Sequence, residues 1–544
     1  MAAISRKMVP ISRQLTRRSF SASSSSPPAI LAFLSSANPS FQQIKQCIVT
    51  RQIDPASPSL FASLKSHPSP PFDLLLRACA DLRLPEKGLE VFYLMKASNL
   101  TPAVHSCNSL LSAFLKSGRT DRAWALYAEM FRMRVQSTVV TYNIMVNVLC
   151  AEGKIKKAIE FVDTMQESGI RPNVVTYNTL IKAYCAIGNV ELAIKMMRLI
   201  WEKEIEPNEY TYGTIISGLS KQGRIDDAAK MFDEMSKREL VSSAPTYNAI
   251  IDGYCKRGEL DRAFRYRDEM VRKGILLDVA TYNVLIHALF MEGRIREANE
   301  LLTEMGEKGM TPDQFTYNIL INGYCKEGDA KKAFELFDEM TDKGIEPTNV
   351  TYTSLIYALC KKCQVGKADI MFKEAAKKGL IPDLFMYNAL IDGYCSAKNM
   401  NRALELLKDM EAKNISPDDV TFSTLIRGFC CLGEVEHARD MIAEMTKRGI
   451  KPDLVSYNTL IGGYSRRGDI KDAMKLKDEM QGKGFNPTLI TYNALIRGMC
   501  KNGKGLRAEE LLKEMVQSGI NPSDSTYISL VEGLSNTEVK LETV

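Results

Sequence analysis

The chain has 544 residues, of which 45% are hydrophobic and 25% charged, and this composition excludes a disordered polymer because it allows a large packed interior. No run approaches the ~18 consecutive apolar residues of a membrane-spanning helix, so membrane insertion is not expected. An odd number of cysteines, 13, without a secretory segment favours a reducing compartment and excludes a disulfide scaffold.

The formal net charge of +6 is unevenly distributed along the chain. Residues 1–68 hold eight Lys/Arg and a single acid, Asp54, whereas residues 69–544 hold 63 Lys/Arg and 64 Asp/Glu. The body of the chain is therefore close to neutral. Affinity for a polyanion would have to come from a local row of cations.

Residues 1–30 have the composition of an organellar transit peptide. They contain five Lys/Arg within the first eighteen residues, no acid, and a serine-rich run. Met8–Arg18 can form a basic amphipathic helix, and Arg18–Ser21 resembles a mitochondrial processing site with cleavage after Phe20. These features predict a mitochondrial location. A chloroplast address and a disordered basic tail are the alternatives.

The chain from Ser69 to Ser523 divides into thirteen windows of 35 residues without insertion or deletion. An aromatic residue occupies the fourth position of every unit from Tyr142 to Tyr527, and alanine holds the twentieth position in twelve of the thirteen windows. This period predicts an all-α fold, an α-solenoid superhelix of about 13–14 helix-turn-helix repeats. A last unit is expected to hold one helix, Asp524–Leu534, before a polar tail. The predicted organisation is a leader or cap region at 31–68, windows at 69–103, 104–138, 139–173, 174–208, 209–243, 244–278, 279–313, 314–348, 349–383, 384–418, 419–453, 454–488 and 489–523, and a partial repeat with a tail at 524–544.

Each window carries two helical patterns. Apolar residues from Tyr177 to Cys185 recur at helical spacing, and Gly188 is placed to end that first helix. In the second helix of another window, Ala333 is small enough to allow close approach of the two helices, and Met340 can fill an irregular gap. Neither helix can bury its apolar stripe alone, so consecutive hairpins are expected to stack.

The residues that could carry chemistry have simpler structural interpretations. Eight cysteines share the twelfth position, on the expected buried face of the first helix. They are Cys150, Cys185, Cys255, Cys325, Cys360, Cys395, Cys430 and Cys500. Cys360 and Cys363 form a C-x-x-C pair, but Cys363 replaces the usual glycine and no second pair completes a metal site, which favours packing over redox or zinc chemistry. We predict no catalytic residue, no metal site and no cofactor.

A 35-residue hairpin with V-T-Y-N-x-L-I at its head and G-[IL]-x-P-D at its tail resembles the pentatricopeptide repeat. The resemblance covers 69–523 and part of a fourteenth unit, and the uniform window length resembles the P class of that family. It implies single-stranded RNA binding, with one base per repeat and the RNA 5′ end towards the protein N-terminus.

In that family, the residues at positions five and thirty-five of a window jointly read one base edge. Position five is polar between apolar neighbours; its residues are Asn108, Asn143, Asn178, Asn248, Asn283, Asn318, Thr353, Asn388, Ser423, Asn458 and Asn493. Helix capping is the alternative interpretation, but a cap would sit more naturally at position three, where threonine recurs. The position-thirty-five residues are Thr138, Asn173, Asn208, Ser243, Asp278, Asp313, Thr348, Asp383, Asp418, Asp453, Thr488 and Ser523.

The resemblance also implies base preferences. Asn with Asp favours uracil, Thr or Ser with Asp favours guanine, and Asn with Asn, Ser or Thr favours pyrimidines, leaning to cytosine for Asn493 with Ser523. Asp73 with Ala103 and Gly213 with Ser243 match no rule. From the second window onward the implied target is Y-Y-Y-N-U-U-Y-G-U-G-Y-C, where Y is a pyrimidine and N is unread.

Two further positions could contribute affinity. Position two is usually apolar and could sandwich bases or pack between repeats, and neither interpretation is preferred; the residues are Val140, Val175, Tyr210, Phe315, Val350, Phe385, Val420, Val455 and Ile490. Position thirteen is basic in seven windows and is predicted to contact phosphates, with a merely solvated surface as the alternative. Its residues are Lys116, Lys221, Lys256, Lys326, Lys361, Arg466 and Lys501.

We therefore predict a monomeric, non-enzymatic, sequence-specific RNA-binding protein of a plant organelle. It would act on organellar transcripts by site occupancy and by recruiting processing, splicing or translation factors. The rival is a protein-interaction scaffold of the tetratricopeptide type, whose 34-residue period and tryptophan pattern are not found here. An enzyme is a second rival, but the unbroken register leaves no inserted catalytic domain.

Overall fold

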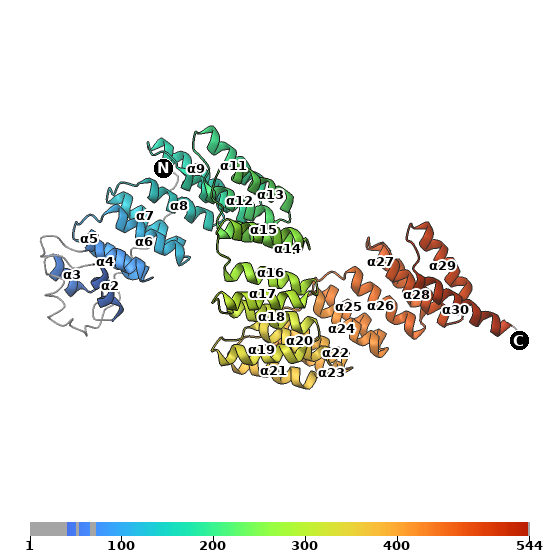
Figure 1. Ribbon diagram of the computed structural model, residues 1–544. Coiled ribbons are helices and arrows are strands. Elements are labelled where there is room, and N and C mark those ends of the chain that lie inside the picture. Colours follow the sequence, from blue (N-terminus) through green and yellow to red (C-terminus); the bar gives the residue numbers. More distant parts are fainter. Residues whose placement is uncertain (1–40, 51–53, 66–71, 542–544) are drawn as a thin grey trace. The chain divides into compact units, whose positions relative to one another are not determined.

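The computed structural model describes residues 41–50, 54–65 and 72–541. Within these residues the regular structure is helical and no strand is formed, which confirms the predicted all-α class (Figure 1). The predicted transit peptide, residues 1–30, lies outside the described residues. The chain forms two compact units, the first holding the residues up to Arg257 with Tyr266–Ile275, and the second holding Gly258–Arg265 and the residues from Leu276 onward.

Each window contributes a first and a second helix, preceded in the chain by α2 (Phe41–Val49) and α3 (Pro58–Lys65). The first helices are α4 (Phe72–Asp81), α6 (Val104–Lys116), α8 (Val139–Ala151), α10 (Val174–Ala186), α12 (Glu209–Lys221), α14 (Ala244–Lys256), α16 (Val279–Met291), α18 (Gln314–Lys326), α20 (Asn349–Lys361), α22 (Leu384–Ser396), α24 (Asp419–Leu432), α26 (Leu454–Arg467), α28 (Leu489–Lys501) and α30 (Asp524–Leu541). The second helices are α5 (Pro85–Ala97), α7 (Thr120–Arg132), α9 (Ile155–Glu167), α11 (Val190–Glu202), α13 (Ile225–Lys237), α15 (Leu260–Arg272), α17 (Ile295–Glu307), α19 (Ala330–Asp342), α21 (Val365–Lys377), α23 (Met400–Ala412), α25 (Val435–Lys447), α27 (Ile470–Gly482) and α29 (Gly505–Gln517).

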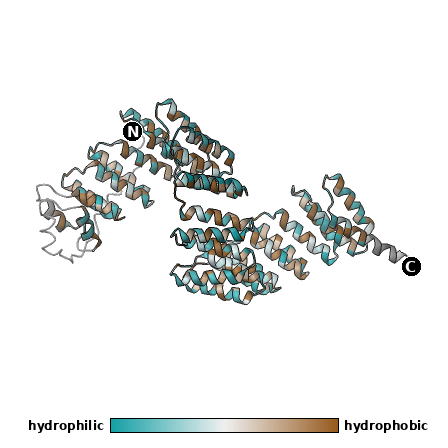
Figure 2. Cartoon of the chain, viewed as in Figure 1, coloured by the Kyte–Doolittle hydropathy of each residue, from teal (hydrophilic) through white to brown (hydrophobic). Residues whose placement is uncertain are grey.

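The hairpins stack as expected for an α-solenoid. Within a unit, a first helix packs against its own second helix and against the first helices of adjacent windows, as α10 does with α11 and α12. The second helix α11 also packs against α12, so each hairpin covers the next. The helices carry both hydrophilic and hydrophobic residues (Figure 2), as amphipathic packing requires. This arrangement confirms the predicted solenoid of paired helices.

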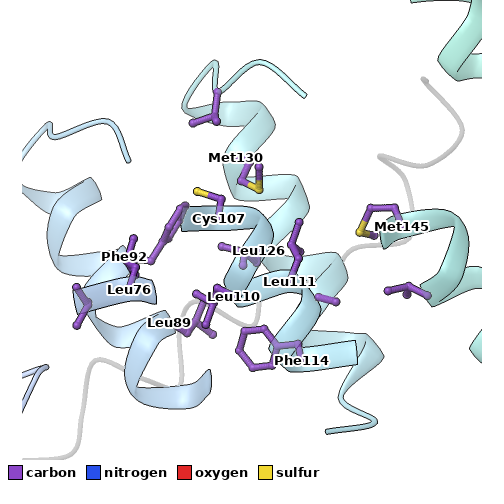
Figure 3. Packing of buried hydrophobic residues seen from close by; sticks show 14 of the residues in the cluster. Leu76, Leu89, Phe92, Cys107, Leu110, Leu111, Phe114, Leu126, Met130 and Met145 are labelled. Carbon is purple, nitrogen blue, oxygen red and sulfur yellow. The ribbon is translucent and has the colours of Figure 1, made fainter. Parts of the chain in front are cut away.

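The buried stripes follow the predicted register. In α18 and α19, Tyr317, Leu320, Ala333 and Met340 are all buried. In the first unit, Leu76, Phe92, Cys107 and Leu110 belong to one continuous core that successive helices build together (Figure 3). None of the described helices combines the length and apolar character needed to cross a lipid bilayer.

Left-handed residues end the first helices. Gly188 has φ of 77°, as its predicted role in ending α10 requires. Three windows use other residues at the same position, Arg83 with φ of 57°, Cys363 with φ of 56° and Lys398 with φ of 60°. Cys363 therefore occupies the position that glycine holds in most repeats, as the sequence predicted.

The cysteines at position twelve pack against the next repeat. In several windows the facing residue is a glycine of the following first helix, and an added Cβ there would collide with sulfur. Gly218 meets Cys185 in this way, and Gly393 meets Cys360. The contact explains why a small apolar thiol recurs, because α20 and α22 approach closely only where one side lacks a side chain.

In many windows a polar contact joins the second helix to its first helix. The Tyr317 hydroxyl donates to Glu339 Oε1 at 2.8 Å, and Lys343 Nζ donates to both, at 3.0 and 2.7 Å. The bond from Lys343 lowers the pKa of Glu339, so the carboxylate stays charged. The arrangement recurs as Tyr282–Glu304–Lys308, Tyr387–Asp409–Lys413 and Tyr457–Glu479–Lys483.

The last helix differs from its predicted extent. A single first helix was expected over Asp524–Leu534, but α30 continues to Leu541. Gly533 lies inside this helix and faces Cys500, as several other inter-repeat glycines face the cysteine of the preceding repeat. No glycine or proline follows Gly533 to break the helix.

Candidate nucleic-acid interface

The position-thirty-five residues cap the first helix of the following repeat. Asp313 precedes α18 and accepts a hydrogen bond from Thr316 N at 2.8 Å, while Asp313 N donates to Thr316 Oγ1 at 3.2 Å. This reciprocal pair is a capping box and satisfies helix-end N–H groups. Capping boxes also precede α8, α10, α12, α16, α20, α24 and α28.

This finding corrects the sequence argument about caps. A cap was expected at position three if anywhere, but the N-cap is the preceding residue, at position thirty-five, and the position-three threonine closes the box. Capping by position five is also wrong, since those residues lie in the second turn of the helix. The side chains at position thirty-five therefore stabilise the fold whether or not they contact a ligand.

The structure brings positions five and thirty-five of the same window together. Although 30 residues separate them in the chain, the position-five amide donates to the position-thirty-five side chain in seven windows. The pairs are Asn108–Thr138 (3.5 Å), Asn143–Asn173 (3.3 Å), Asn178–Asn208 (3.1 Å), Asn283–Asp313 (3.5 Å), Asn318–Thr348 (3.2 Å), Asn388–Asp418 (3.2 Å) and Asn493–Ser523 (3.4 Å).

Four predicted pairs stand apart from these seven. Asn248 belongs to the first compact unit and Asp278 to the second, so their pairing is not described. No hydrogen bond joins the side chains of the remaining three predicted pairs, all of which lie in the described part of the chain: Thr353 with Asp383, Ser423 with Asp453, and Asn458 with Thr488. Ser423 instead contacts Ser456 at 2.9 Å, and the Thr353 hydroxyl is buried without a partner.

The sequence argument missed a third participant, the position-three hydroxyl of the following repeat. Thr421 Oγ1 donates to Asn388 Oδ1 at 2.6 Å, while Asn388 Nδ2 donates to Asp418. The signal was present in the sequence, as a threonine 33 residues after each position-five asparagine. That its hydroxyl meets the amide depends on how the repeats stack.

The position-thirty-five carboxylate of Asp313 remains charged in this setting. Burial alone would raise the pKa of Asp313, but the N–H and hydroxyl of Thr316 and the amide of Asn283 lower it below its ordinary value. The polar cluster at each helix start therefore presents a carboxylate in some repeats and a neutral oxygen in others.

The apolar position-two residues are exposed. All nine predicted residues, from Val140 to Ile490, are between 51% and 72% exposed, Phe385 the most. Packing between repeats does not account for them. In nine of the thirteen windows the first helix therefore begins with one exposed apolar side chain.

The position-thirteen cations are also exposed, at the other end of the first helix. Position thirteen lies eleven residues after position two, which is close to three helical turns. The two positions therefore lie on the same face of the first helix. Two of the seven have acidic neighbours: Lys256 Nζ is 2.6 Å from Asp252 Oδ2, and Lys361 Nζ is 3.7 Å from Asp392 Oδ2. The other five have no carboxylate within 4 Å in the part of the chain that the structure describes.

The cysteines lack the properties of reactive groups. All are free thiols, and burial raises the pKa of Cys360 and of Cys395 to about 12, so neither is a thiolate at neutral pH. Cys363 is exposed, whereas Cys360 is buried. Among the described residues, no three His, Cys, Asp or Glu side chains gather as a metal site would require.

Comparisons with known proteins match the repeat pattern. A model of the PPR repeat family matches residues 102–151, 137–185, 172–221, 211–248, 242–291, 277–326, 312–361, 382–431, 452–501 and 487–536. A second PPR repeat model matches 72–100, 350–380 and 420–450. Together these matches cover most of the predicted windows.

The relatives belong to the same family. A mitochondrial pentatricopeptide repeat-containing protein of Arabidopsis thaliana is 46% identical over 124 residues, which are 22% of this chain and 20% of that protein. Another from Arabidopsis thaliana is 38% identical over 88 residues, 16% of this chain and 8% of that protein. The matched segments therefore span a fifth or less of these curated relatives.

Among solved structures, the pentatricopeptide repeat protein PPR10 from maize has the same fold. Its crystal structure aligns with a TM-score of 0.53 at 22% identity, over 95% of this chain and 96% of that chain. The family models, the curated relatives and the fold agree with the stacked 35-residue hairpins and their capped first helices. The chain belongs to the pentatricopeptide repeat family.

Proposed function

We propose that the protein binds single-stranded RNA in a sequence-specific manner, one nucleotide per repeat. The observation that carries the proposal is the recurrence, in repeat after repeat, of an exposed apolar residue at position two beside a hydrogen-bonded polar pair at positions five and thirty-five. An apolar wall suits the face of a base, and the polar pair suits its edge.

The distribution of charge supports this arrangement. Carboxylates such as Asp418 lie at the start of the first helix and would repel phosphates, so the polar pair suits base edges. The position-thirteen cations lie about 16 Å away along the same face at 1.5 Å per residue. A strand whose bases enter near position two would direct its phosphates towards this row.

Unpartnered polar atoms support a role for position five in ligand contact. Asn283 Oδ1 and Thr353 Oγ1 are buried and have no hydrogen-bond partner. Buried polar atoms without partners are costly in a folded protein, and a base edge would satisfy both.

We further propose that the protein acts on mitochondrial transcripts by occupancy and recruitment, as a P-class member without catalysis of its own. The acid-poor, arginine-rich N-terminus and the mitochondrial relative support the location, with chloroplasts as the competing address. Bound RNA would be shielded from nucleases or held open for processing, splicing or translation factors.

The direct test of the binding surface is truncation of one exposed apolar side chain at position two. Phe385→Ala should weaken RNA binding by about 5- to 150-fold, because stacking is worth ~1–3 kcal/mol per base. Ile370→Ala is the matched control, since Ile370 is 64% exposed on the second helix α21 and lies away from positions two and five. Equal effects of the two variants on binding would reject the surface.

The organellar role is tested by crosslinking the tagged protein in purified mitochondria and sequencing the bound RNA. Recovered sites should match the implied twelve-nucleotide target in register with the repeats. Recovery of the protein from chloroplasts or cytosol alone, or of RNA without a shared sequence, would contradict this part of the proposal.

A further inference from the structure

A threonine follows every position-five asparagine at a spacing of 33 residues. The nine pairs are Asn108–Thr141, Asn143–Thr176, Asn178–Thr211, Asn248–Thr281, Asn283–Thr316, Asn318–Thr351, Asn388–Thr421, Asn458–Thr491 and Asn493–Thr526. The single apolar residue at this place, Met386, follows Thr353, which has no amide to orient. The association indicates that the hydroxyl serves the amide and not only the helix cap.

The hydroxyl contacts the amide oxygen directly in seven windows. The hydroxyl oxygen lies within hydrogen-bonding distance of the Oδ1 of the paired asparagine in Thr141, Thr176, Thr211, Thr351, Thr421, Thr491 and Thr526. In six of these windows, all but that of Asn458, the amide nitrogen donates to the position-thirty-five side chain. The two ends of the amide are thus distinguished by their partners.

The capping box of one repeat contacts both ends of the amide of the repeat before it. At α20, Thr348 N donates to Thr351 Oγ1 at 2.9 Å, the Thr351 hydroxyl donates to Asn318 Oδ1, and Asn318 Nδ2 donates to Thr348 Oγ1 at 3.2 Å. The two hydroxyls also lie 3.2 Å apart, so either can donate to the other. With the amide oriented as in the structure, every proton of this cluster meets an acceptor.

Where position thirty-five is aspartate, the carboxylate can orient the amide without the hydroxyl. Thr421 Oγ1 is 2.6 Å from Asn388 Oδ1 and 2.7 Å from Asp418 Oδ1, and its one proton serves only one of them. At α18 the Thr316 hydroxyl donates to Asp313 at 2.8 Å, and Asn283 Oδ1 is left without a partner. A flipped amide would place its oxygen against the carboxylate, which disfavours the flip in every Asp repeat.

We propose that the position-three threonine of the following repeat is a positioning residue that fixes base selectivity where position thirty-five is neutral. A flipped amide exchanges its donor and acceptor and so presents the wrong pattern to the base edge. Thr351 holds Asn318 in one orientation, whereas Asp418 does so for Asn388 and makes Thr421 dispensable for selectivity. The inference rests on the proposed reading of bases by position five.

The test measures base choice at single nucleotides. The full chain is titrated with UUUAUUXGUGUC, with X each of the four nucleotides, and X faces Asn318 in the implied register. Thr351→Val should reduce the affinity ratio between preferred and rejected bases at X about fivefold, the worth of one net hydrogen bond. Thr351→Ser keeps the hydroxyl and should restore the ratio.

Two controls separate this effect from loss of the helix cap. Thr421→Val removes a similar cap bond but should leave base choice at the ninth nucleotide, opposite Asn388, unchanged. Thr246→Val removes the equivalent hydroxyl behind Gly213, which reads no base; there the hydroxyl contacts Ser243 Oγ at 3.1 Å and forms no capping box, so selectivity should not change. Thermal unfolding of every variant shows that each is folded in the titration.

The outcomes are distinct. Flattened selectivity in Thr351→Val, with selectivity intact in Thr421→Val, supports the proposal. If Thr351→Val keeps full selectivity while Asn318→Ala loses selectivity, the positioning role of Thr351 is overturned. Base reading by Asn318 is then left in place. Unchanged base choice in Asn318→Ala overturns both the positioning role and the proposed function. Equal flattening in Thr351→Val and Thr421→Val also contradicts the proposal, because the carboxylate would then give no protection.

Discussion

Individual residues at the helix ends carry strain that the sequence pattern already marks. Cys363 and Lys398 adopt the left-handed conformation that glycine holds in the equivalent position of other repeats. Left-handed φ costs a residue with a Cβ about 1–2 kcal/mol. Neither residue has a position-specific contact that explains why it replaces glycine.

We expect Cys363→Gly to raise the free energy of unfolding by about 1 kcal/mol, because it relieves this strain at an exposed site. Chemical denaturation of the variant measures the change. Gly328→Ala, at the same position one repeat earlier with φ of 83°, should lower the free energy of unfolding by a similar amount. A destabilised Cys363→Gly would mean that the thiol makes a needed contact.

Much of the site at this scale could be predicted from the sequence, and the rest could not for a physical reason. Asn388 and Asp418 were paired through the resemblance to the family, and the structure places their side chains in contact at 3.2 Å. The capping role of Asp418 and the bond from Thr421 were missed, because both depend on side-chain rotamers at a junction between repeats. The ion pair of Lys361 with Asp392 was missed for the same reason.

At the scale of the helical element, close approach of neighbouring first helices limits which residues fit. Gly393 in α22 faces Cys360 in α20, and a Cβ at Gly393 would collide with the sulfur. Gly366 in α21 has nothing within 4 Å of an added Cβ and has no positive φ, so it is a matched helical glycine without a neighbour.

Gly393→Ala should therefore destabilise the protein by about 1–3 kcal/mol through overpacking, whereas Gly366→Ala should be neutral or stabilise it by up to ~1 kcal/mol. Equilibrium denaturation distinguishes the two. Adding Cys360→Ala to Gly393→Ala should recover part of the loss. If both glycine variants behave alike, the inter-repeat contact does not limit the packing.

Helix existence and register were predictable from the periodicity, since a pattern repeated thirteen times averages out local ambiguity. The end of α30 was not, because residues 535–544 do not carry the apolar pattern of the repeat. The Tyr317–Glu339–Lys343 contact also escaped prediction. It joins two helices of one hairpin at positions whose charges look like an ordinary solvated surface.

For the whole molecule, a neutral body must bind a polyanion through a local row of charges. The seven position-thirteen cations set an upper limit of ~5 on the slope of log affinity against log salt, at ~0.7 per phosphate contact. Lysines already paired to acids should contribute less, because binding would have to displace the carboxylate.

Replacing Lys326 and Lys501 by Ala should shallow the salt slope by ~1.4 and weaken all RNA sequences alike. Replacing Lys256 and Lys361, which have carboxylate neighbours, should reduce the salt slope by a smaller amount. Binding titrations across a salt series measure both slopes. A loss confined to one base identity would show that these lysines do not contact phosphates.

The central claim is that positions five and thirty-five read one base, and the clearest measurement is a specificity exchange at Asn388. Asp418 caps α24 and must be kept, so the change is made at position five alone. Asn388→Thr recreates the Thr353/Asp383 combination, which is assigned to guanine. Wild-type and variant chains are titrated with UUUAUUUGUGUC and with the same RNA carrying G at the ninth nucleotide. We predict that the variant loses about 5- to 150-fold in affinity for the U ligand and regains it with the G ligand. Equal weakening for both ligands, or no change for either, would contradict base reading by position five.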